Sequence, residues 1–175
     1  TSFNVMQYLG VAFIRDFQEA YPNIMPIIIE YPDGTALQSL NEEDVEIALI
    51  PGPIDISIFS IEYLFSSHYC LVIHKSHPLA AKKSVSYHDL HELPLAIRGR
   101  EFSLYGEHQN VFTQHGIAPN SMIETSSYHL IHRMAAANMC VAASLDYVAC
   151  DDPQPDTIIV PLEDDDLVKT IYCAK

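Results

Sequence analysis

The sequence predicts an α/β protein of two lobes, and three observations lead to this prediction. Amphipathic helical segments alternate with short apolar runs along the chain, a pattern typical of parallel sheets covered by helices. A similar order of elements occurs in both halves, although no clear sequence repeat accompanies it. The chain has 175 residues, of which 49% are hydrophobic, so it can bury the core of one domain or of two small lobes.

The first expected element is a helix at the beginning of the chain. Apolar residues recur at spacings of three and four over residues 3–21, which predicts one helix with a buried stripe, and Pro22 ends it. Thr1 and Ser2 stand where the N-cap of this helix is expected. We therefore expect their hydroxyl groups beside backbone N–H groups that have no partner within the helix.

A strand, a short helix and a second strand are expected next. The β-rich run over residues 24–31 predicts a strand, and Pro32-Asp33-Gly34 predicts a turn. Residues 36–43 have the pattern of a short amphipathic helix. Residues 45–50 predict a buried strand, which Pro51-Gly52-Pro53 ends.

The middle of the chain has the pattern of a hinge. An apolar run over residues 69–74 predicts a buried strand, the motif His77-Pro78-Leu79-Ala80 stops it, and residues 87–94 predict a short amphipathic helix. The second half then repeats the alternation of the first. Its expected elements are strand 95–97, loop 98–100, helix 103–115 with Gly116 as C-cap, strand 122–125, helix 127–138, strand 140–143 and the final strands 157–162 and 167–174.

Charge and hydropathy exclude two classes of partner for the chain itself. The formal net charge is -14, with 9 Lys and Arg against 23 Asp and Glu, whereas a nucleic-acid interface needs clustered cations. No apolar run approaches the length of about 20 residues that a membrane span requires. The cysteines Cys70, Cys140, Cys150 and Cys173 show no C-x-x-C pair, which favours buried reduced thiols and a cytoplasmic location.

Motifs for catalysis and metal binding are weak. The chain has no Gly-x-Ser-x-Gly elbow, glycine-rich phosphate loop or His-Glu-x-x-His motif, so enzymatic activity is not favoured. Three His-x-x-His spacings at 74/77, 88/91 and 129/132 raise the alternative of zinc, but no local cysteine or carboxylate completes a ligand set. The run 163–166 is acidic and reads as a solvated turn rather than a cation loop. We expect no cofactor and no metal.

Several short motifs occur in a characteristic order. They are Thr1-Ser2, Tyr21-Pro22, Leu40-Asn41-Glu42-Glu43-Asp44-Val45-Glu46-Ile47-Ala48-Leu49, His77-Pro78-Leu79-Ala80, Asp89-Leu90, Phe112 with Gly116 and Pro119, Glu124 with Ser127, and Met134-Ala135-Ala136-Ala137-Asn138-Met139-Cys140-Val141-Ala142. In this order, over nearly the whole chain, they resemble the effector-binding domain of LysR-type transcriptional regulators.

The resemblance implies two Rossmann-like lobes, as in type 2 periplasmic binding proteins, with an interlobe cleft. Lobe I would comprise residues 1–75 plus 162–175, and lobe II residues 76–161. The implied function is to sense a small anionic metabolite between the lobes and thereby control DNA binding and transcription. The implied partners are a small-molecule effector, a homodimer or homotetramer of the chain, and DNA through an N-terminal winged helix-turn-helix domain absent from these residues; no membrane is involved.

The sequence departs from the family at two places. Asn138 and Cys140 stand where the family usually has glycines, and the larger side chain of Cys140 narrows the space beside the cleft. The family's first strand and closing helix are also missing. We expect additional residues, a swapped strand of a partner or unusual pairing to fill the gap.

Candidate ligand-binding residues follow from the loops after the strands, where ligands of parallel sheets collect. A hydroxyl, a helix N-terminus or an arginine fork suits an anion, although Ser2 and the Ser126–Ser127 pair are equally suited to helix capping and Arg98 to a surface ion pair. The candidates are Thr1, Ser2, Pro51 and Gly52 in the first lobe, and Arg98, Gly99, Ser126, Ser127 and Ala143 in the second.

Two other functions stay open from the sequence. A solute-binding protein of a transporter has the same lobes without a DNA partner. A metabolic enzyme on this scaffold would need a nucleophile and a base within hydrogen-bond reach in the cleft.

Overall fold

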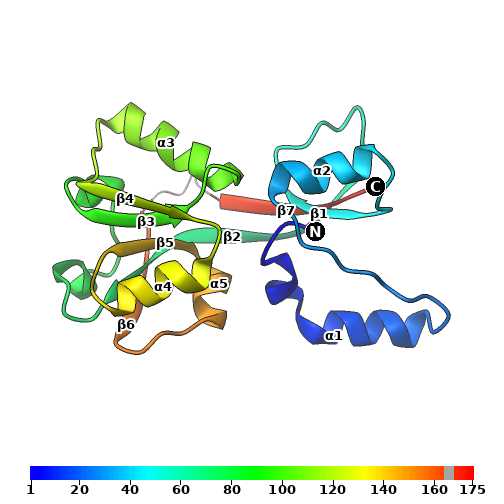
Figure 1. The fold of residues 1–175 in the computed structure, drawn as a ribbon, viewed down its shortest axis with the longest axis horizontal. Coiled ribbons are helices and arrows are strands. Elements are labelled where there is room, and N and C mark those ends of the chain that lie inside the picture. The colour runs from blue at the N-terminus through cyan, green and yellow to red at the C-terminus, as the bar shows by residue number, and fades with distance from the viewer. Residues whose placement is uncertain (164–167) are drawn as a thin grey trace. The chain divides into compact units, whose positions relative to one another are not determined.

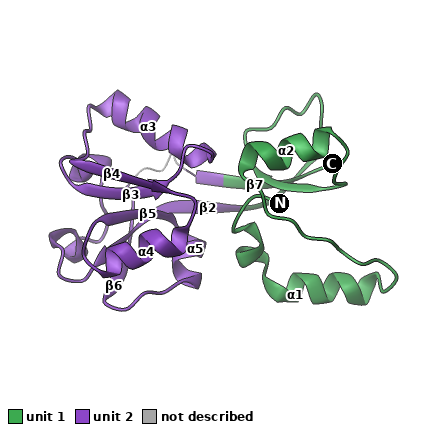
Figure 2. Ribbon diagram, in the orientation of Figure 1, with its two compact units in different colours: residues 1–65, 170–175 green, residues 66–169 purple. Residues whose placement is uncertain are grey.

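The computed structural model describes residues 1–163 and 168–175 and divides the chain into two compact units (Figure 1, Figure 2). Unit 1 comprises Thr1–Phe65 and Thr170–Lys175, and unit 2 comprises Ser66–Lys169. Two strands, β2 (Ile61–His74) and β7 (Val168–Ala174), have residues in both units. Among the described residues, none of the helices combines the length and apolar character that a membrane span requires.

Unit 1 contains two helices and a small sheet. Its helices are α1 (Val5–Ala20) and α2 (Asp33–Asn41), and its sheet pairs β1 (Ala48–Pro51) antiparallel with β7. The helix α2 covers β1, and the core between them is formed by Ala36, Leu40, Ala48, Ile50 and Ala174. The predicted helices 3–21 and 36–43 and the predicted strand 45–50 are therefore confirmed, with shifted ends.

The strand predicted for residues 24–31 is wrong. Within the described chain, residues 24–30 form no ladder, and only Tyr31 makes an isolated parallel bridge, to Ser2. The isoleucines of this run stay in solvent, with Ile27 84% exposed. The run has the composition of a strand, but a strand forms only where a neighbouring chain segment accepts its backbone hydrogen bonds.

The buried stripe predicted for the first helix is also wrong. In α1, all of which the structure describes, only Val5 is buried, and Phe13 of the expected stripe is exposed. The helix is kinked at Gly10, whose φ of 68° and ψ of 178° interrupt the helical backbone. Helical spacing predicts the helix correctly, but burial of its apolar side chains also requires a surface to cover them.

Unit 2 is a mixed sheet with helices on both faces (Figure 1). Its strands pair in the order β2–β5–β3–β4, with β6 also on β2; β3 is parallel to β4 and β5, whereas β2 is antiparallel to β5 and β6. Its elements, besides its part of β2 and β7, are the 3-10 helices η1 (Pro78–Ala81) and η2 (Tyr87–Leu90), β3 (Pro94–Arg98), α3 (Ser103–His115), β4 (Ser121–Thr125), α4 (Tyr128–Ala136), β5 (Val141–Leu145), α5 (Asp146–Asp151) and β6 (Thr157–Pro161).

The sheet of unit 2 is buried on both faces. Successive residues of β3 point to different core clusters: Leu95 and Ile97 pack with Phe112 of α3, whereas Ala96 packs with Ile131 of α4. Such two-sided burial explains why the strands read as continuous apolar runs. The strands and helices predicted between residues 95 and 162 are confirmed, but the short helix expected over 87–94 is only the 3-10 turn η2, and Pro94 already opens β3.

The division between the units falls inside the two shared strands, at 65/66 and 169/170. The sequence places it at 75/76 and 161/162 instead, next to His77-Pro78-Leu79-Ala80, which lies within unit 2. There the His77 ring accepts a hydrogen bond from the Leu79 N–H at 3.2 Å and caps η1. A strand that continues through the division carries no turn or proline signal, so the sequence cannot mark this position. Of the predicted acidic turn, residues 164–166 lie outside the described residues.

Candidate ligand-binding site

Ser2 holds an unsatisfied hydroxyl group in unit 1. Its backbone N–H donates to the carbonyl of Leu49 at 2.8 Å, and the residue is only 2% exposed. Within residues 1–163 and 168–175, the Ser2 Oγ is the one buried side-chain oxygen or nitrogen without a hydrogen-bond partner. An unpaired buried polar group costs about 1–3 kcal/mol, so a ligand that reaches this hydroxyl would recover that free energy.

Thr1 and Ser2 do not cap the first helix, contrary to the prediction. The N-cap of α1 is Asn4, which has a left-handed φ of 70°. The Thr1 Oγ1 donates to backbone carbonyls, that of Leu49 at 3.3 Å among them, and the Thr1 amino group donates to Ile29. Burial lowers the pKa of this amino group. Thr1 is thus engaged with the backbone, whereas the Ser2 hydroxyl is available.

Pro51 and Gly52 stand at the end of β1, beside β7. Pro51 is paired with Ile171, and the Gly52 N–H donates to the Thr170 carbonyl at 3.0 Å. A β-carbon added to Gly52 would lie 2.7 Å from the ring of Tyr172, so only glycine leaves room for this ring. Thr1, Ser2, Pro51 and Gly52 all belong to unit 1.

Replacing Gly52 with alanine is expected to destabilise the fold by about 1–3 kcal/mol, because the Tyr172 ring must shift to admit the new methyl group. Urea unfolding measures this difference. The matched control is Gly106→Ala on the exposed side of α3. There an added β-carbon would meet no other described segment within 4 Å, and a helical alanine is expected to stabilise by about 0.5–1 kcal/mol. Equal effects of the two substitutions would contradict the role given to Tyr172.

In unit 2, the parallel pairing of β3 and β4 brings two predicted loops together. Arg98 and Thr125 are paired at the ends of these strands, and the Gly99 N–H donates to the Thr125 carbonyl at 3.1 Å. Arg98-Gly99 therefore lies next to Ser126-Ser127, as their position after parallel strands predicts. The exposed carboxylate of Glu101 lies over Gly99. Ala143 differs: it is buried in the core cluster of β5 and is not presented on a loop.

Arg98 is a buried cation held by two aromatic rings. It is 4% exposed, and its guanidinium carbon lies 3.5 Å from the centroid of the Phe102 ring and 4.5 Å from that of Tyr128. Cation–π contacts of this kind favour a fixed, charged guanidinium. Phe102 and Tyr128 stand at the beginnings of α3 and α4, whose N-termini carry partial positive charge. This edge of unit 2 is electrostatically suited to an anion.

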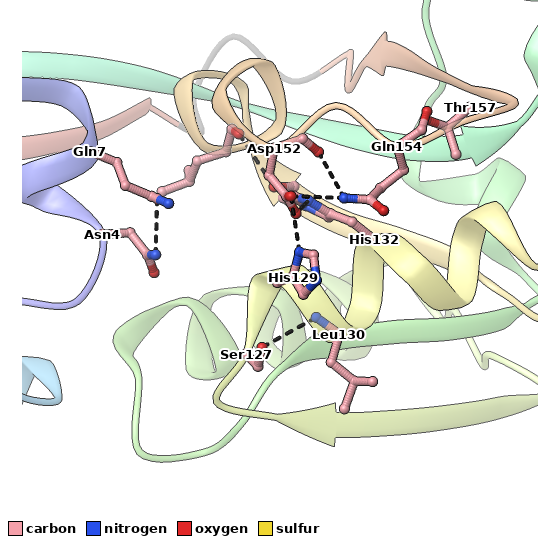
Figure 3. Close-up of polar contacts among 11 residues, drawn as sticks. Asn4, Gln7, Ser127, His129, Leu130, His132, Asp152, Gln154 and Thr157 are labelled. Atoms are coloured by element: carbon pink, nitrogen blue, oxygen red, sulfur yellow. Dashed lines mark hydrogen bonds and ion pairs between the residues drawn. The ribbon is translucent and has the colours of Figure 1, made fainter. Parts of the chain in front are cut away.

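Ser127 acts as a helix cap. Its hydroxyl accepts a hydrogen bond from the Leu130 N–H at 3.2 Å (Figure 3), and its own N–H donates to Thr125 Oγ1 at 3.3 Å. The capping alternative thus applies to Ser127 in this structure. Ser126 precedes it and is exposed.

Two histidines of α4 form a hydrogen-bond network with Asp152 that the sequence did not predict. The Asp152 carboxylate lies 3.0 Å from Nδ1 of both His129 and His132 and accepts a hydrogen bond from Gln154 (Figure 3), while His132 Nε2 lies 2.9 Å from the Ser144 Oγ. Burial lowers the pKa of His132.

The network joins two histidines of α4 to one carboxylate and to a serine of β5. Ser144 and His132 are both fully buried, and each is the hydrogen-bond partner of the other. In the part of the chain that the structure describes, no three His, Cys, Asp or Glu side chains are grouped as a metal site requires. The i, i+3 spacing of the histidines was visible in the sequence, but Asp152 as their shared partner was not. The contacts fasten α4, which begins at the Arg98 edge, to β5 and to the end of α5.

The chain is similar to one protein family and to several curated proteins. The family described as LysR substrate binding domain matches residues 2–174. The uncharacterized HTH-type transcriptional regulator YwbI of Bacillus subtilis is 25% identical over 152 residues, which cover 86% of this chain and 50% of the relative. Other curated relatives are also named as transcriptional regulators. The chain spans about half the length of the curated relatives it matches.

Solved structures show the same fold. The effector-binding domain of BenM with its effector benzoate has a TM-score of 0.84 at 21% identity, over 99% of this chain and 80% of that chain. The regulatory domain of CcmR of Synechocystis PCC6803, in complex with 2-PG, has a TM-score of 0.84 at 15% identity, over 99% of this chain and 84% of that chain. The predicted α/β class, of the type 2 periplasmic-binding-protein kind, is confirmed.

Proposed function

Because the chain belongs to the LysR substrate binding domain family, we propose that it is the effector-sensing domain of a LysR-type transcriptional regulator and that its effector is a small anion. The family consists of transcriptional regulators, not enzymes. The observation that carries the choice of an anion is Arg98, buried between Phe102 and Tyr128 at the beginnings of two helices. On a chain with a net charge of -14, an anion needs such a local cation.

We assign complementary roles to the groups of the two units. Arg98, with its planar and always charged guanidinium, would attract a carboxylate or phosphate oxygen, and Gly99 and the exposed Ser126 lie on the same edge. In unit 1, the unsatisfied Ser2 hydroxyl is the group with most to gain from a ligand. Pro51 and Gly52 shape the adjoining loop, and Thr1 would position Ser2 through its hydrogen bonds to Ile29 and Leu49. That the effector lies between the lobes stays a prediction.

The regulator would act in the cytoplasm as a homodimer or homotetramer and would bind DNA through a winged helix-turn-helix domain outside these residues. The DNA-binding domain is supported by the curated relatives, which are about twice as long as this chain and bear the name HTH-type. Effector binding controls transcription by shifting the balance between conformations, and it can do so only by its difference in affinity for them. We propose no catalytic step. The alternative of a transporter's solute-binding protein finds no support in these relatives.

A thermal-shift screen tests the proposal. Aromatic acids, dicarboxylates, amino acids and phosphorylated acids are each compared with their neutral amide or ester analogues. A ligand at 100 times its Kd stabilises the fold by about 2.7 kcal/mol, which corresponds to a rise in Tm of several degrees. We expect at least one acid to raise the Tm while its neutral analogue does not. Stabilisation by neutral analogues alone would refute an anionic effector.

A further inference from the structure

Both strands that pass through the division are held by one side chain of unit 2. The Oε1 of Glu107, in the second turn of α3, accepts a hydrogen bond from the Lys169 ammonium group of β7 at 2.5 Å. Its Oε2 accepts a hydrogen bond from the Tyr69 hydroxyl of β2. Lys169 is the last residue of unit 2 before β7 enters unit 1, and Tyr69 closely follows Ser66, where β2 enters unit 2. All three residues belong to unit 2.

Lys169 is firmly tied to α3. The lysine is 3% exposed, and its ammonium group also donates to the Ser103 Oγ at 2.7 Å. Ser103 and Glu107 are four residues apart, so they lie on the same face of α3. A buried ammonium group that loses its carboxylate is left uncompensated in a poorly solvated place, which strongly disfavours separation.

Tyr69 is tied to the same carboxylate from β2. It is buried, and its ring meets that of His108 edge-on at 5.4 Å. Burial and the nearby Glu107 carboxylate raise the pKa of Tyr69, so its hydroxyl stays protonated and keeps donating. A second tie lies two residues earlier, where the buried Ser67 hydroxyl donates to Asp146 Oδ1 at 2.6 Å.

The same strands make other contacts in unit 1, where the buried ring of Phe65 in β2 stacks on Tyr8 of α1 with 3.6 Å between the ring centroids. In unit 1, the ion pair between β2 and the chain end joins Glu62 and Lys175 at 2.8 Å, and both side chains are more than half exposed. Exposed pairs of this kind contribute little to stability. Glu107 differs from these groups because its one carboxylate bonds to side chains of both strands.

From these contacts we propose that Glu107 is an anchor residue that fixes both shared strands to α3. Its carboxylate then couples the local stability of β2 at Tyr69 to that of β7 at Lys169. This inference concerns a conformational device of the fold and does not depend on the proposed function or on any effector.

Hydrogen exchange measured by mass spectrometry tests the anchor in the ligand-free protein. In Glu107→Gln, peptides covering residues 66–72 and 168–171 are expected to exchange about tenfold faster, while peptides of β3, α4 and β5 keep their rates. Lys169→Met, which removes the cation, should give the same local pattern. The milder Tyr69→Phe removes one hydroxyl and should affect residues 66–72 alone.

The matched control is Glu62→Gln, which removes the exposed carboxylate at the other end of the same strands. It is expected to leave exchange at 66–72 and 168–171 unchanged. Unchanged exchange of these peptides in Glu107→Gln would overturn the proposal, and so would an increase spread evenly over unit 2, which indicates general destabilisation. Should Glu107→Gln not fold, the local pattern in Tyr69→Phe decides, because a loss confined to 66–72 supports the anchor and none overturns it.

Discussion

An Arg98→Ala variant is expected to bind an anionic effector about 30- to 150-fold more weakly than the parent chain. A hydrogen bond to a charged group contributes about 1.5–3 kcal/mol, and a fork of two such bonds lies at the upper end of that range. Because Phe102 and Tyr128 already hold the guanidinium, little side-chain freedom is lost on binding, which favours a large effect. Isothermal titration calorimetry with the best acid from the screen measures the loss.

Two further variants separate the fork from the charge. Arg98→Lys keeps the charge but neither the planar fork nor the aromatic stacking, so an intermediate loss is expected. Arg100→Ala is the matched control, because Arg100 lies two residues away, is well exposed and pairs with Glu124 at 3.1 Å. It should keep affinity within about threefold. Equal affinity of Arg98→Ala and the parent, with the fold intact by circular dichroism, would remove Arg98 from the site.

The architecture of unit 2 was predictable because its strands are buried on both faces. Two-sided burial makes β3 and β5 continuous apolar runs, and the helices between them carry their own caps, such as Gly116 after α3. Parallel pairing then places the ends of β3 and β4 side by side, so the proximity of Arg98 to Ser126 followed from order along the chain. These features depend on local pattern and simple topology.

Unit 1 was harder to predict because its irregular parts depend on distant neighbours. The run 24–31 has a strand's composition, but within residues 1–163 and 168–175 only Tyr31 of this run makes a β-bridge, to Ser2. The apolar spacing of α1 predicts a helix yet says nothing about what covers it.

Side-chain geometry of the site was equally hidden. The Tyr128 ring on Arg98 and the Asp152 link between two histidines both join segments that are separate in sequence. The lack of a partner for the Ser2 hydroxyl among the described residues likewise depends on the folded surroundings of Ser2. The hydrophobic periodicity of a sequence does not predict such contacts between distant side chains.

Acidification from pH 6.5 to pH 4 is expected to remove about 3 kcal/mol of stability through His108 alone. This histidine of α3 is buried, its Nδ1 lies 3.1 Å from the Tyr87 hydroxyl, and its ring packs on Phe112. Burial lowers the pKa of His108 to about 4; the Glu107 carboxylate opposes this shift and the Lys169 ammonium group adds to it. The histidine pKa in the unfolded chain is about 6.5. Between this pH and pH 4 the unfolded chain therefore binds a proton that the folded protein does not bind.

The sign and the slope of this effect can both be measured. Above pH 6.5 the histidine is neutral in both states and its contribution is fully present; below that it falls by at most about 1.4 kcal/mol per pH unit until the folded protein also takes up the proton near pH 4. Urea unfolding of His108→Phe should show a pH dependence flatter by about one proton over this range, whatever its stability at pH 7.5. His115→Gln, an exposed histidine of the same helix, should match the parent. A parallel pH dependence in His108→Phe and the parent would mean that other groups cause the acid sensitivity.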